Sequence, residues 1–465
     1  MNNFLSFIKN VALTFCLLLS VQSVFGQYNF PVMYGTHFTT QASRFQPTKL
    51  GQGIGIFEAN MGVYTAIGTN ALNFGQALDI GGLDFGSRTN DLTNAKMNEI
   101  VENFASYNTA SVSAYTTFNM FYKFRKKREG EHHRELFSLS LEFAPRAEAN
   151  VVFSNEVARF FWYGNKQYGN NPVNMGDVRV NMMASNEAVL GAATDVYKKD
   201  NFKIRLGLRL KYIMPIANIY TQRADAVVQN VGNGYDQQTL ITTNYQGSSS
   251  LPENFAAGDF IKSNIGNGFG ADLGVTAEFK NHIVATISVL DIGQVKYNNN
   301  VKNYALSKNF VFDGISVTGN GETGSIIDSL GNALKFIETA NAYSAPLPTR
   351  MILQGEYHIK KPDKDDREHT KHAFYFTYIQ GFRNYGVATT RPVVNVGYSF
   401  NIKKMFNTGA SFGFSGQSGF TAGLWLSTRF LGTTFGLGCD NIAPLIAPNS
   451  ANASTGLAFN LGISF

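Results

Sequence analysis

Apolar and polar residues alternate with a period of two over long stretches of the chain. Between Ala110 and Phe124 the even-numbered positions are mostly apolar, and the odd-numbered positions are mostly polar. Residues 137–150 and 269–279 repeat the pattern. A helix with this sequence would scatter its apolar residues around the axis, whereas a strand gathers them on one face. The pattern therefore predicts β-strands with one apolar face.

Fourteen segments have this character, an even number, as a single-chain bacterial barrel requires if both ends lie on one side of the membrane. The last of them ends on Phe465, and we expect it to close the barrel against the first. The predicted strands are 53–65, 109–124, 136–152, 178–197, 202–214, 268–279, 283–296, 349–361, 372–382, 392–402, 405–415, 420–430, 433–440 and 455–465.

The connections between these segments alternate in length. Those after even-numbered strands are short or strongly charged, and those after odd-numbered strands include 66–108, 153–177, 215–267 and 297–348. Barrels of the bacterial outer membrane have short periplasmic turns and long outer loops. In the long loops we expect extra hairpins near Val227 and Phe310 and an amphipathic helix at Ile326–Ile337.

Composition agrees with a membrane barrel. Aromatic residues make up 13% of the chain and charged residues only 15%, below the ~25% of soluble domains. The mean hydropathy is nevertheless −0.12, and no long apolar run follows the N-terminus. We therefore predict an all-β fold, a transmembrane antiparallel β-barrel of 14 strands.

The N-terminus carries the pattern of an export signal. Lys9 precedes an apolar stretch, and small residues before Gln27 form a cleavage site. We expect residues 1–26 to be a signal peptide, 27–52 an N-terminal segment that folds into the lumen as a plug, and 53–465 the barrel. The expected location is the outer membrane, with its lipid and the barrel-assembly machinery as partners.

Cationic residues alternate with apolar ones in "FKIRLGLRLKY". A Lys or Arg on the lipid face near the midplane costs about 2–4 kcal/mol, so several together must face the lumen. Two interpretations remain open for the predicted lumen-lining charges: a salt-bridge lattice that stiffens the barrel, or a permeation path or anionic head-group site. These residues are Glu142, Arg146, Glu148, Arg179, Glu187, Lys203, Arg205, Arg209, Lys211, Asp272, Glu278, Arg350, Glu356 and His358.

Other functional classes find little support in the sequence. The net charge is +6, but no basic run is interleaved with aromatic residues, so we expect no nucleic-acid partner. "GNGETG" matches a dinucleotide-binding motif but lacks the βαβ context that the motif needs. The histidines have no metal-ligand spacing, and no serine near His358 lies in a nucleophile motif. We expect no cofactor, no metal and no enzymatic activity.

Several stretches resemble a family of Bacteroidota outer-membrane proteins known as domain of unknown function 5723. They are "WYGNKQYGNNPVNMGD", "LGLRLKYIMPIANIYT", "GFGADLGVTAEF", "LPTRMILQGEYHI" and the Phe-terminated last strand. The family is similar in outline to FadL-like transporters and to PorV-type barrels of a secretion system. FadL relatives often carry Asn-Pro-Ala near the barrel start, where this chain has Gln46-Pro47-Thr48.

The resemblance implies two alternative functions. The first is FadL-like passage of small hydrophobic or amphipathic compounds through the barrel. The alternative is a PorV-like, non-transporting barrel that binds secretion-system or other surface proteins. The resemblance supplies no catalytic residues.

Overall fold

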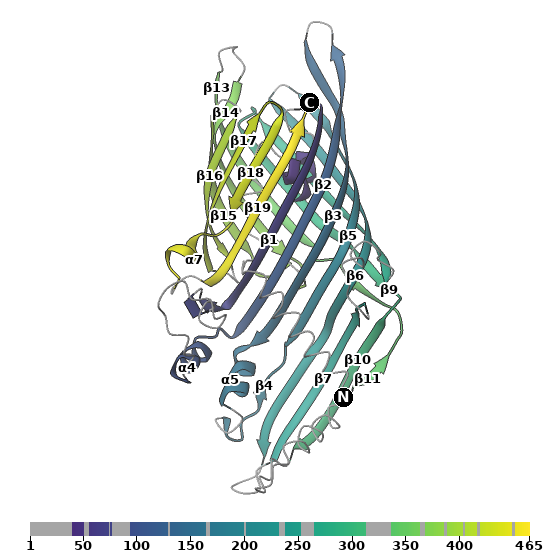
Figure 1. Ribbon diagram of the computed structural model, residues 1–465, viewed down its shortest axis with the longest axis vertical. Helices are drawn as coiled ribbons and strands as arrows, with labels where there is room; N and C mark the ends of the chain where they lie inside the picture. The colour runs from purple at the N-terminus through teal and green to yellow at the C-terminus, as the bar shows by residue number, and fades with distance from the viewer. Residues whose placement is uncertain are drawn as a thin grey trace.

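The chain forms a closed, 14-stranded antiparallel β-barrel, as predicted (Figure 1). The computed structural model describes residues 40–50, 55–73, 75–76, 94–128, 131–163, 168–199, 201–231, 238–252, 265–312, 336–362, 368–385, 388–402, 405–415, 419–448 and 452–465. The barrel strands are β1 (Phe57–Asn73), β2 (Tyr107–Arg128), β3 (Glu131–Ser154), β5 (Arg179–Lys199), β6 (Phe202–Val231), β8 (Gly266–Phe279), β9 (Ile283–Tyr297), β13 (Arg350–Pro362), β14 (Glu368–Gly381), β15 (Val393–Ile402), β16 (Phe406–Ser415), β17 (Gly419–Phe430), β18 (Thr433–Cys439) and β19 (Asn452–Ser464).

Closure comes from the first and last strands. β19 pairs with β1 in antiparallel register from Glu58 opposite Ser464 to Gly68 opposite Ser454. Each predicted segment overlaps one barrel strand, and the main differences in length are in β1, which runs to Asn73, and in β6, which runs to Val231. Because every strand has two neighbours, the barrel leaves no edge that lipid would have to satisfy.

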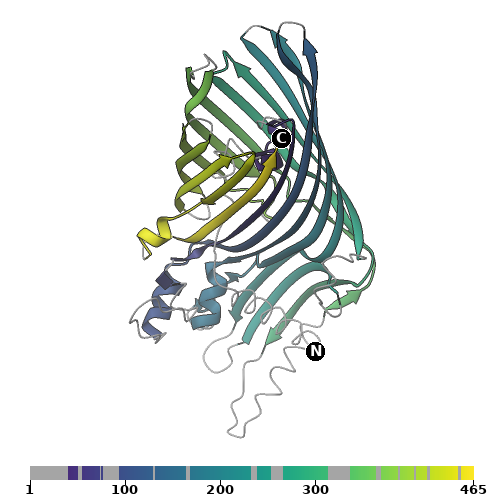
Figure 2. The ribbon, with the colours of Figure 1, turned by 45° about the horizontal axis from the view of Figure 1, so that its top comes forward.

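A sheet extension prolongs one side of the barrel (Figures 1 and 2). The C-terminal part of β6 extends beyond the barrel wall and pairs with β7 (Gln238–Ser250), which pairs with β10 (Val301–Phe312). Two short strands add to it: β4 (Val173–Asn174) pairs with β6, and β11 (Ile337–Thr339) pairs with β10, whereas β12 (Tyr343–Pro346) pairs with the barrel strand β9.

The structure can be compared with the hairpins and the helix that the sequence predicts in the long loops. The expected hairpin at Val227 is the β6–β7 pair, but Phe310 pairs across to β7 rather than within a local hairpin. Of the expected helix, residues 326–335 lie outside the described residues, and Ile337 begins β11.

The helices are short. α4 (Asn94–Glu102) and α5 (Asn155–Tyr163) lie at the end of the barrel with the sheet extension, opposite the C-terminus (Figure 1). α7 (Ala443–Ile446) precedes β19, and two 3₁₀ turns, η1 (Thr40–Arg44) and η2 (Pro47–Lys49), precede β1. In the described part of the chain, no helix is long and apolar enough to cross a membrane.

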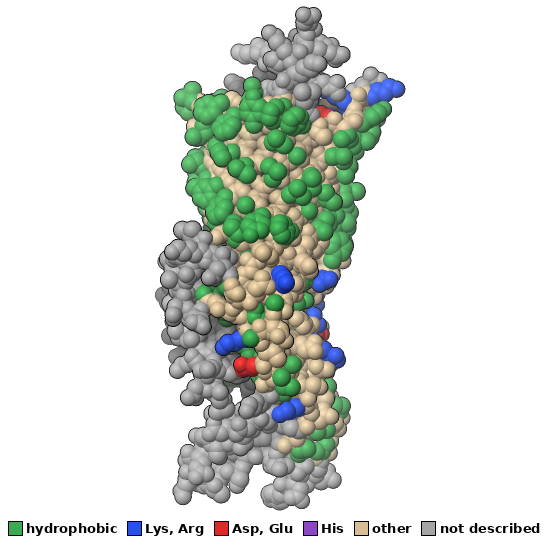
Figure 3. Space-filling model, turned by 90° about the vertical axis from the view of Figure 1, so that its right-hand side faces the viewer, with side chains coloured by type: hydrophobic (Ala, Val, Ile, Leu, Met, Phe, Trp, Pro, Cys, Tyr) green, Lys and Arg blue, Asp and Glu red, His purple; other side chains and the backbone are tan. Residues whose placement is uncertain are grey.

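Because apolar and polar residues alternate along the strands, the barrel has a mainly apolar outer face and a mainly polar inner face. On β6, Leu206, Leu208 and Leu210 are exposed on the outer face, whereas Arg205 and Arg209 are buried. Figure 3 shows a band of hydrophobic side chains, interspersed with other side chains, over the barrel on one face, with most Lys, Arg, Asp and Glu side chains of that view below it. The band is the surface that a bilayer would cover.

Candidate functional site: the interior of the barrel

Residues 40–50, called here the interior segment, lie inside the ring of strands (Figure 2). Its backbone is bound by two arginines of β6. Arg205 donates hydrogen bonds to the carbonyl oxygens of Thr48 (2.9 Å) and Leu50 (2.6 Å), and Arg209 donates to that of Arg44 (3.0 Å). Two of the cationic residues predicted to face the lumen from β6, Arg205 and Arg209, therefore bind the backbone of the interior segment. The predicted boundaries at residues 26 and 52 fall outside the described residues and stay predictions.

A glycine lets the interior segment approach the wall closely. Gly207, on β6, lies against the backbone of Pro47, and a Cβ added there would come within 2.3 Å of the Pro47 carbonyl carbon. Gly274, opposite Gly207 on β8, also faces Pro47. The small residues therefore form a flat seat for η2 that a larger side chain would remove.

Side chains anchor the segment at a second place. Lys49 Nζ lies 2.5 Å from Glu356 Oε1 on β13. The same carboxylate accepts hydrogen bonds from Gln354 (3.1 Å) and contacts His358 Nε2 (2.8 Å). Thr48 is hydrogen-bonded to Thr276 at 2.6 Å. The segment is thus tied to β6, β8 and β13.

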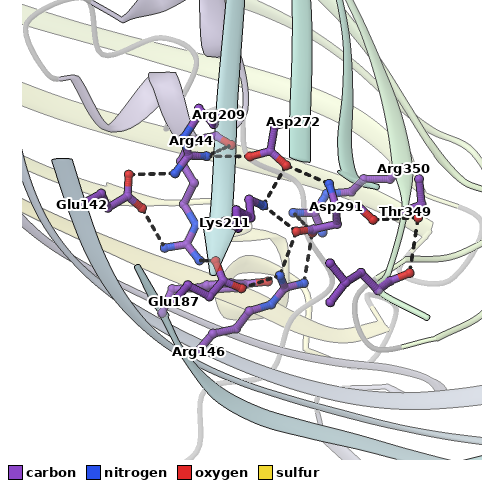
Figure 4. Close-up of polar contacts among 12 residues, drawn as sticks. Arg44, Glu142, Arg146, Glu187, Arg209, Lys211, Asp272, Asp291, Thr349 and Arg350 are labelled. Carbon is purple, nitrogen blue, oxygen red and sulfur yellow. Dashed lines mark hydrogen bonds and ion pairs between the residues drawn. The ribbon is translucent and has the colours of Figure 1, made fainter. Parts of the chain in front are cut away.

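A buried network of charges crosses the barrel beside the segment (Figure 4). Arg209 lies between Glu142 (2.7 Å) and Asp272 (2.9 Å), and Lys211 lies between Asp272 (2.7 Å) and Asp291 (2.6 Å). The cations are Arg44, Arg146, Arg209, Lys211 and Arg350, and the carboxylates are Glu142, Glu148, Glu187, Asp272 and Asp291. Five positive and five negative groups balance, so this network carries no net charge.

Asp291 is central to the network, and strict alternation did not predict it. Arg146 makes two parallel hydrogen bonds to its carboxylate, at 3.0 and 3.1 Å, and Lys211 and Arg350 face it as well. Alternation along β9 would place Asp291 on the lipid face. A register shift against β8 and a positive φ of 57° turn it inward. The signal in the sequence is "DIG", an Asp and a Gly within a strand, which is typical of a bulge.

An apolar cluster also occupies the interior, and we call it the Phe45 cluster. Among the described residues, Phe45 of the interior segment is the one member that does not come from a barrel strand, and its exposed fraction is 1%. Arg44 stacks over Tyr115 at 4.2 Å, which joins the cluster to the charged network. The members are Phe45, Tyr64, Ala66, Tyr115, Leu290, Ile352, Tyr375, Ile379, Val393, Trp425 and Ala458.

The structure places the predicted lumen-lining residues in four settings. Glu142, Arg146, Glu148, Glu187, Arg209, Lys211, Asp272 and Arg350 belong to the charged network, and Arg205, Glu356 and His358 lie at the anchors of the interior segment. Lys203 and Glu278 form a partly exposed pair at 2.7 Å. Arg179 lies apart, paired with Asp177 and 38% exposed. The sequence prediction did not single out Arg44, Asp291 or the Phe45 cluster.

In the part of the chain that the structure describes, no group of three or more His, Cys, Asp or Glu side chains is placed to hold a metal ion.

A family model decides the relationship of the chain to known proteins. The model described as "Family of unknown function (DUF5723)" matches residues 28–440. The chain belongs to this family. The family predicted from the sequence is thereby confirmed, but its description assigns no activity. No curated protein matches the sequence of this DUF5723 chain.

Solved structures of two toluene transporters and of a FadL homologue are similar to the chain in outline. The toluene transporter TbuX of Ralstonia pickettii has a TM-score of 0.43 at 8% identity, covering 95% of this chain and 98% of that one. A Pseudomonas aeruginosa FadL homologue has a TM-score of 0.41 at 10% identity, and the Pseudomonas putida toluene transporter TodX has 0.42 at 7%, each with the same coverage.

Proposed function

We propose that the chain is an outer-membrane barrel that passes small hydrophobic or amphipathic compounds through its interior. The Phe45 cluster supports this proposal most strongly. The inner face of a water-filled barrel is polar, because it alternates with the lipid-facing side chains. Here aromatic and aliphatic side chains from β1, β2, β9, β13, β14, β15, β17 and β19 meet inside the barrel instead. Such a surface suits an apolar solute.

The interior segment gives the route a movable part in this proposal. Phe45 is a fully buried member of the cluster, so in this proposal a passing compound takes its place or moves it aside. The charged network is balanced and buried, and in this account it is the frame that holds the wall and the segment in position. We therefore interpret the interior charges as a salt-bridge lattice that stiffens the barrel, not as a permeation path or an anionic head-group site.

The side chains on the outside of the barrel support a location in the outer membrane. The apolar band in Figure 3 fits a bilayer, and closure at β1–β19 leaves no unpaired strand edge within it. Lipid of the outer membrane and the barrel-assembly machinery are the partners that follow from this location. We propose no enzymatic role for the chain.

Transport in reconstituted vesicles tests the proposal. Uptake of apolar and amphipathic solutes is measured with the full chain, with a chain lacking residues 27–52, and with protein-free vesicles. The proposal expects faster uptake with the full chain than without protein, and a further increase when the segment is removed. If neither protein accelerates the uptake of any such solute, the proposal is wrong.

A second candidate function is a PorV-like barrel that binds other proteins. The observation that favours it is the sheet extension of β6, β7 and β10, which reaches beyond the hydrophobic band and exposes charged residues such as Arg223 and Asp225. Crosslinking in intact cells tests it. Reproducible protein partners that depend on the extension would favour this candidate, and the absence of any partner would exclude it.

A further inference from the structure

Three neutral polar residues form a row on adjacent strands of the barrel's inner face. Gln354 of β13 is opposite Thr377 of β14, and Thr377 is opposite Asn395 of β15. All three are almost fully buried, with exposed fractions of 3%, 1% and 1%. We call Gln354, Thr377 and Asn395 the neutral row.

The neutral row has unused hydrogen-bonding capacity. In the described structure, Thr377 Oγ1, both amide atoms of Asn395 and Oε1 of Gln354 have no hydrogen-bond partner. The hydroxyl of Tyr375, two residues before Thr377, is also unpaired there. Folded proteins keep few buried polar atoms unpaired, because the lost hydrogen bonds to water are not replaced. Several in adjacent positions point to a partner from outside the chain.

The row borders the Phe45 cluster. Two residues along each strand, Ile352 is opposite Ile379 and Ile379 is opposite Val393, and all three belong to the cluster. On the other side of the row, Tyr375 packs against Trp425, with ring centroids 5.7 Å apart. A compound with one apolar and one polar end would therefore meet matching surfaces at both ends.

The charges nearby limit what the polar end can be. Glu356 is paired with Lys49 and His358, and Arg350 faces Asp291. The row itself offers both donors and acceptors: Thr377 and Tyr375 hydroxyls, the Asn395 amide, and Gln354 Oε1. A hydroxyl or amide group can use both kinds, whereas a carboxylate can use only donors and would also lie near Glu356.

We propose that the neutral row binds the uncharged hydroxyl or amide end of an amphipathic compound whose apolar body packs in the Phe45 cluster. This inference rests on the proposed function and names the chemical class of its solute: neutral amphiphiles, rather than organic acids or pure hydrocarbons.

Fluorescence of Trp425 provides the test, because its ring lies in the cluster. The chain has two tryptophans, so Trp162→Phe leaves one reporter. Phe45→Ala is added to make room for one ring. The full chain with both substitutions is placed in lipid nanodiscs and titrated with cyclohexanol, methylcyclohexane and cyclohexanecarboxylate. We expect cyclohexanol to bind at least about fivefold more tightly than methylcyclohexane, as one or two neutral hydrogen bonds imply, and the carboxylate to bind most weakly.

Row variants separate hydrogen bonding from packing. Thr377→Val and Asn395→Leu remove polar atoms with little change in volume, so each should abolish the preference for cyclohexanol while methylcyclohexane binds as before. Thr434→Val is the matched control: Thr434 is a buried threonine of β18 outside the row and the cluster, and this substitution should leave all three affinities unchanged.

The outcomes distinguish this inference from the function on which it rests. If cyclohexanol and methylcyclohexane bind equally, if the row variants weaken both alike, or if the carboxylate binds best, the inference is wrong and the proposed function stands. If none of the three compounds binds, the Phe45 cluster is not a solute site and the proposed function fails with the inference.

Discussion

A single carboxylate, that of Asp291, holds much of the buried network together. It faces Arg146, Lys211 and Arg350, and its own carbonyl oxygen accepts a hydrogen bond from Thr349 (2.7 Å). Asp291 also adopts a left-handed backbone conformation, which Asp and Asn tolerate better than other residues with side chains. A substitution that keeps this backbone preference can therefore test the contribution of the charge by itself.

Asp291→Asn keeps the backbone preference and removes the charge. Three buried cations would then lose a shared counter-charge, and breaking a buried pair in this way costs about 3–5 kcal/mol. We expect the free energy of unfolding in lipid vesicles to fall by that amount, as measured by urea titration. Asp225→Asn, at an exposed pair with Arg223, is the control and should change it by less than about 1 kcal/mol. An unfolding midpoint for Asp291→Asn equal to that of the wild type would contradict this account of the network.

The sequence predicts individual interior residues only where the alternation is regular. On β6, Arg205, Arg209 and Lys211 follow the pattern and are buried inside the barrel. Asp291 breaks the pattern because the bulge in β9 adds one residue and reverses the face. Asp195, opposite Arg205 on β5, is a local partner of this arginine, but two further partners were not predictable, since they are backbone carbonyl oxygens of a segment more than 150 residues away in sequence.

At the scale of elements, the fit between η2 and the wall depends on glycine. Gly207→Ala would place a methyl group within 2.3 Å of the Pro47 backbone, and overpacking of this kind costs about 1–3 kcal/mol. We expect the segment to leave its seat in most molecules. Carbodiimide treatment reports this, because it joins Lys49 to Glu356 only when the segment is docked.

Gly355→Ala is the matched control for this experiment. Gly355 lies on β13, and an added Cβ there would meet nothing within 4 Å. The Lys49–Glu356 crosslink should persist in this variant and be largely lost in Gly207→Ala. Equal crosslinking in the two variants would show that η2 does not depend on the seat.

Phe465 follows β19 and extends the pairing of that strand with the start of β1. The backbone of Phe465 donates to Phe57 O (2.9 Å) and accepts from Ile56 (2.6 Å), and its ring stacks on Phe57. Deletion of Phe465 removes these contacts at the closing seam. We expect a clear loss of folded barrel in the outer membrane, measured as the fraction that migrates as folded protein on gels without heating.

Phe465→Tyr keeps both the backbone and the aromatic ring and serves as the control. It should assemble as the wild type does. Normal assembly of the deletion variant would show that closure does not need the terminal residue.

At the scale of the whole molecule, the number of barrel strands follows from the sequence, but the position of the sheet extension does not. A transmembrane strand needs only a local alternation, and all fourteen have one. The extension arises because β6 continues beyond the barrel and pairs with β7, which pairs with β10, more than 50 residues later in the chain. Local patterns contain no information about such long-range pairing. The same holds for the Phe45 cluster, whose members come from nine separate places in the chain.

In the proposed function, solutes cross the barrel past Phe45. The most direct measurement is the rate at which a neutral amphiphile crosses outer-membrane vesicles, where lipopolysaccharide slows unaided entry. Phe45→Ala should raise the rate several-fold over the wild type, because it removes one buried ring from the cluster while Arg205, Arg209 and Lys49 still hold the segment. Phe104→Ala, outside the barrel strands and packed against Phe153, should leave the rate unchanged. A rate that is the same for the wild type, Phe45→Ala and vesicles without the barrel would contradict the claim.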